Sequence, residues 1–144
     1  MKVEPYLFFE GRCEEALDFY RRALGAEVTA LMRYKDNPEP AAGPPGCAAE
    51  GASAGPRPEM VMHAVFRLGD TQLMASDGLG SGKPHFQGVS LSLNPATEAE
   101  AQRLFSALAD GGTVQMPLGK TFFSPAFGMV ADRFGLSWMV VVAQ

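Results

Sequence analysis

The chain has 144 residues, 47% of them hydrophobic and 19% charged, which is the size and composition of one globular domain and excludes extended disorder. The net charge is −4 and the basic residues are scattered along the chain, which disfavours a nucleic-acid-binding protein. No apolar run reaches the roughly 20 residues that span a bilayer, and Glu4 and Glu10 interrupt the N-terminal segment where a signal peptide would stay apolar, so we expect a cytoplasmic protein that binds no membrane.

The first half of the chain predicts a strand, a helix and three further strands. Apolar side chains after the first strand recur at the spacing of an amphipathic helix, which Gly25 ends. The last two strands are joined at Gly69 and Asp70, a pair typical of a hairpin turn. The predicted elements are a strand at 3–9, a helix up to Leu24, and strands at 26–34, 61–68 and 71–76.

Residues 35–58 differ in kind from the rest. Sixteen of these 24 residues are Pro, Gly or Ala, and the segment shows no apolar period. Such a segment buries too little surface to offset the entropy of ordering, so we expect a mobile excursion between strands, without helix or interior strand. Cys47 lies in it and Cys13 lies near the start of the first helix, with no CxxC motif. We expect two reduced thiols, one disulfide being the alternative.

The second half predicts the same order of elements. Val89, Leu91 and Leu93 alternate with hydroxyl and amide side chains, the pattern of a strand with one apolar face. Thr97 is a candidate N-cap of the next helix, with Glu100 at the capping-box position. The remaining predicted elements are a helix ending at Gly111-Gly112, a strand at 113–116, a loop at 117–126 and a closing hairpin with strands at 127–132 and 136–142.

The strongest pattern in the sequence is therefore a repeat of strand, helix, strand, strand, strand. The apolar helix positions of the two halves align, although any two amphipathic helices would do so. Both hairpins also carry an arginine, a glycine and a hydroxyl side chain, in Arg67-Leu68-Gly69-Asp70-Thr71 and Arg133-Phe134-Gly135-Leu136-Ser137. One helix covers one face of a sheet, so two such units are expected to pair. We predict an α+β fold in a single domain, 1–144, of two paired βαβββ modules, 1–83 and 84–144.

Several stretches resemble a known family. They are Pro5-Tyr6-Leu7-Phe8-Phe9, Ala16-Leu17-Asp18-Phe19-Tyr20, Leu24-Gly25-Ala26, Met74-Ala75-Ser76-Asp77, Thr121-Phe122-Phe123, Phe127-Gly128 and Asp132-Arg133-Phe134-Gly135-Leu136-Ser137-Trp138-Met139. Together with the repeat, they resemble the vicinal oxygen chelate superfamily of glyoxalase I, extradiol dioxygenases and bleomycin resistance proteins, and within it the PhnB-like group. The resemblance covers nearly the whole chain except 35–58. It implies a homodimer whose curved mixed sheets form a cup around a cavity.

Metal-dependent members of that superfamily hold a divalent ion with inward-facing side chains on the first, fourth, fifth and last strands. The corresponding positions here carry Pro5, Leu73 (or Met74, one residue on), Gly88 and Met139. None of these residues offers the nitrogen, carboxylate or thiolate ligands that such ions take in proteins. The resemblance therefore implies no metal site here, and we expect no cofactor.

The two faces of the predicted sheets differ in polarity. The concave face would combine an apolar wall with hydroxyl groups and one carboxylate, which suits a small organic ligand; a solvated sheet face is the equal alternative. We assign to the concave face Leu7, Phe9, Leu73, Ala75, Asp77, Ser90, Ser92, Asn94, Ser137 and Met139. The residues assigned to the helices are Tyr6, Phe8, Met74, Val89, Leu91, Leu93, Trp138 and Val140. Phe122, beside Phe123, is a candidate for closing over a ligand, although core packing or a dimer contact explains it equally well.

Three side chains are candidates for catalysis. Asp77 could serve as a general base on this wall, but an aspartate before glycine more often stabilises a turn. His63 and His85 lack a nearby carboxylate partner, so structural roles are favoured for both; His85 lies beside Phe86 in a glycine-flanked loop that could cover a cavity. No glycine-rich loop follows a strand as a nucleotide site requires.

These observations favour a metal-free dimeric binding protein for an unknown small organic molecule. The first alternative is an enzyme. It would be either a glyoxalase-type lyase or isomerase, or a phosphonate-metabolism enzyme as the PhnB name implies. Such an enzyme would need a metal, or an acid or base with a tuned pKa. The second alternative is an interaction module that recruits a partner through residues 35–58.

Overall fold

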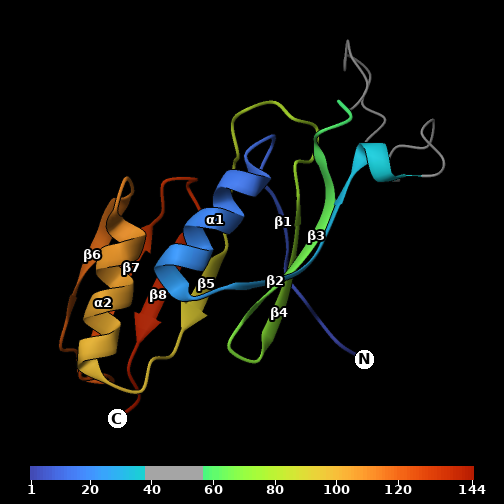
Figure 1. Cartoon of the computed structure of the whole chain (residues 1–144). Coiled ribbons are helices and arrows are strands. Elements are labelled where there is room, and N and C mark those ends of the chain that lie inside the picture. Colours follow the sequence, from blue (N-terminus) through green and yellow to red (C-terminus); the bar gives the residue numbers. More distant parts are fainter. Residues whose placement is uncertain (38–56) are drawn as a thin grey trace. The chain divides into compact units, whose positions relative to one another are not determined.

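The computed structural model describes residues 1–37 and 57–144, which divide into two compact units, Met1–Pro84 and His85–Gln144 (Figure 1). Within these described residues, each unit contains one α-helix and a sheet of four strands. The elements of the first unit are β1 (Tyr6–Phe8), α1 (Cys13–Leu24), β2 (Glu27–Arg33), the 3₁₀ helix η1 (Tyr34–Asp36), β3 (Val61–Leu68) and β4 (Thr71–Ser76). Those of the second unit are β5 (Ser90–Leu93), α2 (Glu98–Ala109), β6 (Thr113–Gly119), β7 (Phe127–Ala131) and β8 (Ser137–Val141).

The two sheets have the same topology. The strand order is β1-β4-β3-β2 in the first unit and β5-β8-β7-β6 in the second. In each sheet the first strand of the unit pairs in parallel with the last, and the other two pairs are antiparallel. Because order and direction agree strand by strand, the predicted α+β fold of two βαβββ modules is confirmed. The homodimer stays a prediction.

Helix α1 covers one face of the first sheet. The ring of Tyr20 stacks on that of Phe66 in β3, with centroids 6.1 Å apart and an interplanar angle of 11°, and it contacts Phe9 at 6.0 Å. Gly25 ends the helix in the left-handed conformation, with φ of 71°, and its N–H donates to the carbonyl of Arg21. Glycine adopts this conformation without strain, so the predicted end of the helix is confirmed.

Helix α2 covers one face of the second sheet and begins as predicted. The side chain of Thr97 accepts a hydrogen bond from the backbone N–H of Glu100 at 3.1 Å. The carboxylate of Glu100 accepts from the N–H of Ala96, at 3.4 Å, rather than from that of Thr97, so one half of the capping box forms. The helix buries Ala101, Leu104, Phe105 and Leu108 against the sheet.

Removing this cap should have a modest effect on stability. We expect Thr97→Ala to lower the free energy of unfolding by about 1 kcal/mol, because the N–H of Glu100 loses its acceptor. Urea denaturation followed by circular dichroism measures the change. Thr97→Ser, which keeps the hydroxyl, should retain most of the stability, and equal losses in the two variants would contradict the capping role.

Two predicted boundaries are wrong, for local reasons. Strand β6 continues to Gly119 through Pro117, where a loop was expected. A proline is tolerated there because β6 is the edge strand, and its pairing with β7 shifts register between Met116 and Gly119. Helix η1 contains Lys35 and Asp36, the first two residues of the predicted excursion. The backbone N–H of Arg33, the N-cap residue, donates a hydrogen bond to the carboxylate of Asp36 at 3.0 Å. Residues 38–56, including Cys47, lie outside the described residues.

Candidate functional site: the open faces of the two sheets

Each sheet has one face under its own helix and one face turned away from it, which we call the open face. On the open face of the first sheet, Tyr6 pairs across strands with Met74, and Met74 pairs with Val65. Tyr6 is 36% exposed and Phe8 48% exposed, although both are large hydrophobic side chains. Met74, Val65 and His63 are half-buried on the same side. Around Tyr6 the open face of this sheet is thus largely apolar and partly accessible, and the polar pair of Arg67 and Gln72 lies further along the same face.

The sequence prediction for the faces of this sheet was wrong. Leu7, Phe9, Leu73 and Ala75 were assigned to the concave face, but all four are buried, and Phe9 contacts Tyr20 of α1. Conversely, the open face carries three residues that had been assigned to the helix: Tyr6, Phe8 and Met74. Side chains alternate along a strand, so an offset of one residue exchanges the two faces completely.

The open face of the first sheet has one polar group at its centre. The hydroxyl of Tyr6 lies 3.0 Å from Nδ1 of His63, which is a hydrogen bond across β4. The two ring centroids are 5.6 Å apart, and the ring of Phe8 lies 5.0 Å from that of Tyr6. The partner of His63 is therefore a phenol, which agrees with the expectation of a hydrogen-bonded histidine without a carboxylate partner.

Sequence reasoning missed Tyr6, Phe8 and Met74 as candidate site residues. The run Tyr6-Leu7-Phe8-Phe9 is apolar at every position, so its alternation does not show which face is buried. The usable signal is the single hydroxyl of Tyr6, because a tyrosine keeps its polar end near water or a partner more readily than leucine or phenylalanine does.

The open face of the second sheet carries the residues that the sequence placed there. Ser90 pairs with Ser137 and Ser92 pairs with Met139, while Trp138 and Val140 on the alternate positions are buried under α2. The hydroxyl of Ser90 donates to that of Ser137 at 3.2 Å, and Ser137 donates to the side-chain oxygen of Gln115 at 2.9 Å. A row of thioethers runs beside these groups, because Met116, Met129 and Met139 are successive cross-strand partners.

Two further predicted residues lie away from these strands. Phe122, in the loop between β6 and β7, is 93% exposed and makes an edge contact with Phe123. His85 is exposed before β5, and its Nε2 lies 3.2 Å from the side-chain oxygen of Gln87. A ligand contact by either residue stays a prediction.

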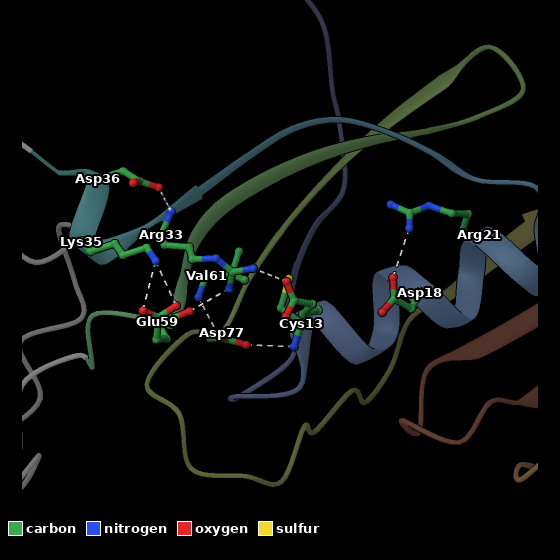
Figure 2. A network of polar contacts seen from close by, with 10 residues as sticks. Cys13, Asp18, Arg21, Arg33, Lys35, Asp36, Glu59, Val61 and Asp77 are labelled. Atoms are coloured by element: carbon green, nitrogen blue, oxygen red, sulfur yellow. Dashed lines mark hydrogen bonds and ion pairs between the residues drawn. The ribbon is translucent and has the colours of Figure 1, made fainter.

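Asp77 has a structural position in the first unit. Its carboxylate is buried and accepts two backbone hydrogen bonds, from Cys13 at 2.8 Å and from Val61 at 2.7 Å (Figure 2). Cys13 is the first residue of α1, and the N-cap residue Arg12 provides no side-chain cap, so Asp77 caps this helix from a distant part of the chain. Both carboxylate oxygens are engaged, which does not suit a general base.

Ion pairs connect the strand ends next to Asp77. Arg33 pairs with Glu14 of α1 and donates to the carbonyl of Glu59 at 2.9 Å. Lys35 pairs with Glu59 at 3.1 Å, as Figure 2 shows. Hydrogen bonding to Glu14 raises the pKa of Arg33. These pairs hold the end of β2 and the start of β3 against α1, and exposed pairs of this kind contribute little to stability.

The thiol of Cys13 is buried at the start of α1. Burial raises its pKa far above the ordinary value, and the charges of Asp77 and Glu14 raise it further. A thiol reacts as the thiolate, so Cys13 should be inert in the folded protein.

This inertness can be tested in a Cys47→Ser background. We expect Cys13 to resist iodoacetamide at pH 8 until urea unfolds the protein, as measured by mass spectrometry.

The raised pKa of Cys13 also makes stability depend on pH. The thiol of the unfolded chain ionises near pH 8.5 and the thiol of the folded chain does not. The free energy of unfolding should therefore fall by up to about 1.4 kcal/mol per pH unit above that value. Cys13→Ala should remove this part of the alkaline loss; an unchanged slope would contradict the raised pKa.

The residues that the resemblance places at metal-ligand positions can be located on the strands. On β4, Leu73 is buried under α1 and its alternative Met74 lies on the open face. Met139 lies on β8 and pairs with Ser92, while Pro5 and Gly88 lie before the first residues of β1 and β5. Within residues 1–37 and 57–144, no three His, Cys, Asp or Glu side chains lie close enough together to hold a metal ion.

In the described residues, two units share one βαβββ topology with a helix on one face of each sheet, which is the module of the glyoxalase fold. The chain matches the family model of 3-demethylubiquinone-9 3-methyltransferase over residues 1–141, and it belongs to this PhnB-like family. No helix in the parts of the chain that the structure describes is long and apolar enough to cross a bilayer.

Relatives of known structure or sequence match over their whole length. Protein PA1353 from Pseudomonas aeruginosa is 42% identical, with a TM-score of 0.80 over 100% of this chain and 98% of that one. Protein YjdN of Escherichia coli K12 is 34% identical over 100% of this chain and 97% of its own. A putative 3-demethylubiquinone-9 3-methyltransferase, PhnB protein, from Bacillus cereus is 30% identical, with a TM-score of 0.76 over 99% and 100% of the two chains. The fold is shared with a member of the glyoxalase/bleomycin resistance protein/dioxygenase superfamily from Sphaerobacter thermophilus. That protein is 19% identical, with a TM-score of 0.54 over 99% of this chain and 98% of its own.

Proposed function

We propose that the protein is a dimeric binding protein that holds a small organic molecule on the open faces of its sheets without a metal ion. The observation that supports this most directly is the open face of the first sheet, where Tyr6 and Phe8 remain partly exposed around the hydrogen bond between Tyr6 and His63. An apolar surface with one well-placed polar group is typical of sites for small organic ligands. The net charge of −4 favours a neutral or cationic ligand over an anionic one.

The open-face residues at and beside the positions that the resemblance assigns to metal ligands support binding without a metal. Tyr6, Met74, Ser92 and Met139 face the open sides of their sheets. Thioether and neutral hydroxyl groups are poor ligands for the divalent ions that act as Lewis acids. The surface is therefore suited to hold a molecule rather than to chelate its oxygens through an ion.

The second candidate is an enzyme, and the pair of Tyr6 and His63 favours it. A phenol hydrogen-bonded to an imidazole can pass a proton to or from a bound molecule. The reaction would be that of a glyoxalase-type lyase or isomerase, of a phosphonate-metabolism enzyme, or of the methyltransferase that the family description names.

Native mass spectrometry of the purified protein tests the binding function. We expect the mass of a dimer, with a non-covalent small-molecule adduct that disappears when the protein is unfolded. Phe8→Ala should lose the adduct, while Val3→Ala, an exposed apolar residue before β1, should retain it. A monomer without adduct would contradict the proposal, and a stoichiometric divalent metal found by elemental analysis would favour the enzyme.

A further inference from the structure

Three of the eight methionines of the chain form a row across the second sheet, and we call them the methionine row. They are Met116 of β6, Met129 of β7 and Met139 of β8, and these three strands are neighbours in the sheet (Figure 1). Met129 is the cross-strand partner of both Met116 and Met139. Directly opposed residues point their side chains to the same face of a sheet, so the three thioethers stand side by side.

The methionine row lies on the open face of the second sheet. Val130 follows Met129 on β7 and Trp138 precedes Met139 on β8, and both of these neighbours are buried under α2. Because side chains alternate along a strand, Met129 and Met139 point away from the helix. They are half-buried, and Met116 is 45% exposed. The three sulfurs are therefore not enclosed in the core of the unit.

An irregularity in β6 brings Met116 into this row. Val114 pairs with Val130, so a regular ladder would place Gln115 opposite the preceding residue of β7. That residue is Met129, and its partner is Met116 because the register shifts at this point. Irregularities of this kind are common where a strand directs a particular side chain into a functional site.

The polar groups beside the methionine row are paired with one another. The side-chain oxygen of Gln115 accepts a hydrogen bond from Ser137, whose hydroxyl accepts one from Ser90. Ser92 continues the row on β5 as the partner of Met139. The row thus offers three neutral thioethers, with a neutral hydroxyl at its end.

Three thioethers match a soft monovalent cation. Thioether sulfur is a soft donor that selects Cu(I), whereas carboxylate, carbonyl and water oxygens suit Mg²⁺ and Mn²⁺. Directly opposed residues have their Cβ atoms about 4.5–5.5 Å apart. Each methionine carries its sulfur at the end of a flexible chain with three rotatable bonds, so the two outer sulfurs can lean toward the middle one. The net charge of −4 also favours a cation.

We propose that Met116, Met129 and Met139 together bind one copper(I) ion through their sulfur atoms. This ion differs in charge and in ligands from the divalent ion of metal-dependent relatives, and only Met139 of the row stands at a position that the resemblance assigns to a metal ligand. The site goes beyond the proposed binding of an organic molecule, which requires no ion, and the two do not depend on each other.

Silver(I) has the charge and softness of copper(I) and keeps its oxidation state, so it is the first probe. The full chain carries Cys13→Ala and Cys47→Ser, which removes both thiols. In titration calorimetry, Met129→Leu should weaken silver(I) binding about tenfold or more, because even changes beside the ligands of a metal site cost about tenfold. Met62→Leu makes the same change at a half-buried position of β3 and should leave the affinity unchanged. Thermal unfolding checks that each variant is folded.

The methyl resonances of the methionines give a second measurement that a purely structural role would not affect. With ¹³C-methyl-labelled methionine, silver(I) should shift the resonances of Met116, Met129 and Met139 and leave that of Met62 in place. Copper(I), added as its acetonitrile complex under nitrogen, should shift the same three, and zinc(II) should shift none of them.

Shifts at fewer than three of these resonances, an equal response to zinc(II), or full silver(I) affinity in Met129→Leu would overturn the copper(I) site. None of these outcomes bears on the small-molecule adduct expected in native mass spectrometry, so the site and the proposed function can fail separately.

Discussion

Replacing Gly112 with alanine is expected to lower the free energy of unfolding by about 3 kcal/mol. A Cβ at this position would lie 2.2 Å from the carbonyl oxygen of Ala131 and 3.0 Å from the Cα of Asp132. Both are backbone atoms, so they cannot rotate away as the end of a side chain would. The clash of the added Cβ can be relieved only if β6 moves away from β7 at Thr113, whose cross-strand partner is Ala131. Overpacking against backbone has a large effect because the strand pairing itself must give way.

The other end of the same strand offers a matched control. Gly119 is the last residue of β6, and an added Cβ there would meet nothing within 4 Å. Gly119→Ala should therefore change the free energy of unfolding by less than about 0.5 kcal/mol. Urea denaturation followed by circular dichroism measures both variants. Equal losses would show that the flexibility of glycine, rather than the close approach at Gly112, sets the effect.

Elements whose limits depend on local chemistry were predicted accurately. The hairpin strands β3 and β4 have the bounds expected from the turn at Gly69 and Asp70. The start and end of the helices followed from Thr97 and Gly25, because capping depends on residues within one helical turn. The repeat of two βαβββ modules followed from the same local signals taken in order.

The assignment of sheet faces succeeded in one unit and failed in the other. Along β5, Ser90 and Ser92 alternate with leucines, and β8 begins with Ser137 on the same face as Ser90, so the face under α2 is visible in the sequence. Along β1, β3 and β4, apolar residues occupy both faces, and only packing against Tyr20 of α1 decides between them. The hydrogen bond of Tyr6 with His63 depends on this choice, so the sequence could not predict it.

The role of Asp77 was predicted only in part. An aspartate before a glycine indicates a turn, and the side chain of Ser76 does accept a hydrogen bond from Gly78 in that turn. The partners of the Asp77 carboxylate, Cys13 and Val61, belong to elements that are distant in sequence. No local pattern connects a carboxylate to backbone groups that only the folded chain brings beside it.

Asp77→Asn should therefore act on stability, with an expected loss of about 3 kcal/mol in the free energy of unfolding. The amide has one acceptor oxygen where the carboxylate has two, so either Cys13 or Val61 would have its N–H facing the amide NH₂. The site is buried, and water cannot easily replace the lost acceptor. The change also removes a negative charge from the N-terminal end of α1.

Asp70→Asn makes the same chemical change at an exposed turn and should alter stability by less than about 0.5 kcal/mol. Urea denaturation of both variants measures the difference, and native mass spectrometry of each folded variant shows whether the small-molecule adduct is retained. If Asp77 caps α1 and orders the start of β3, folded Asp77→Asn protein should retain the small-molecule adduct as the parent does. A variant that keeps its stability and loses binding would contradict the capping role. It would instead assign Asp77 to the ligand site, because the parent carboxylate would then act on the bound molecule rather than hold the two backbone groups.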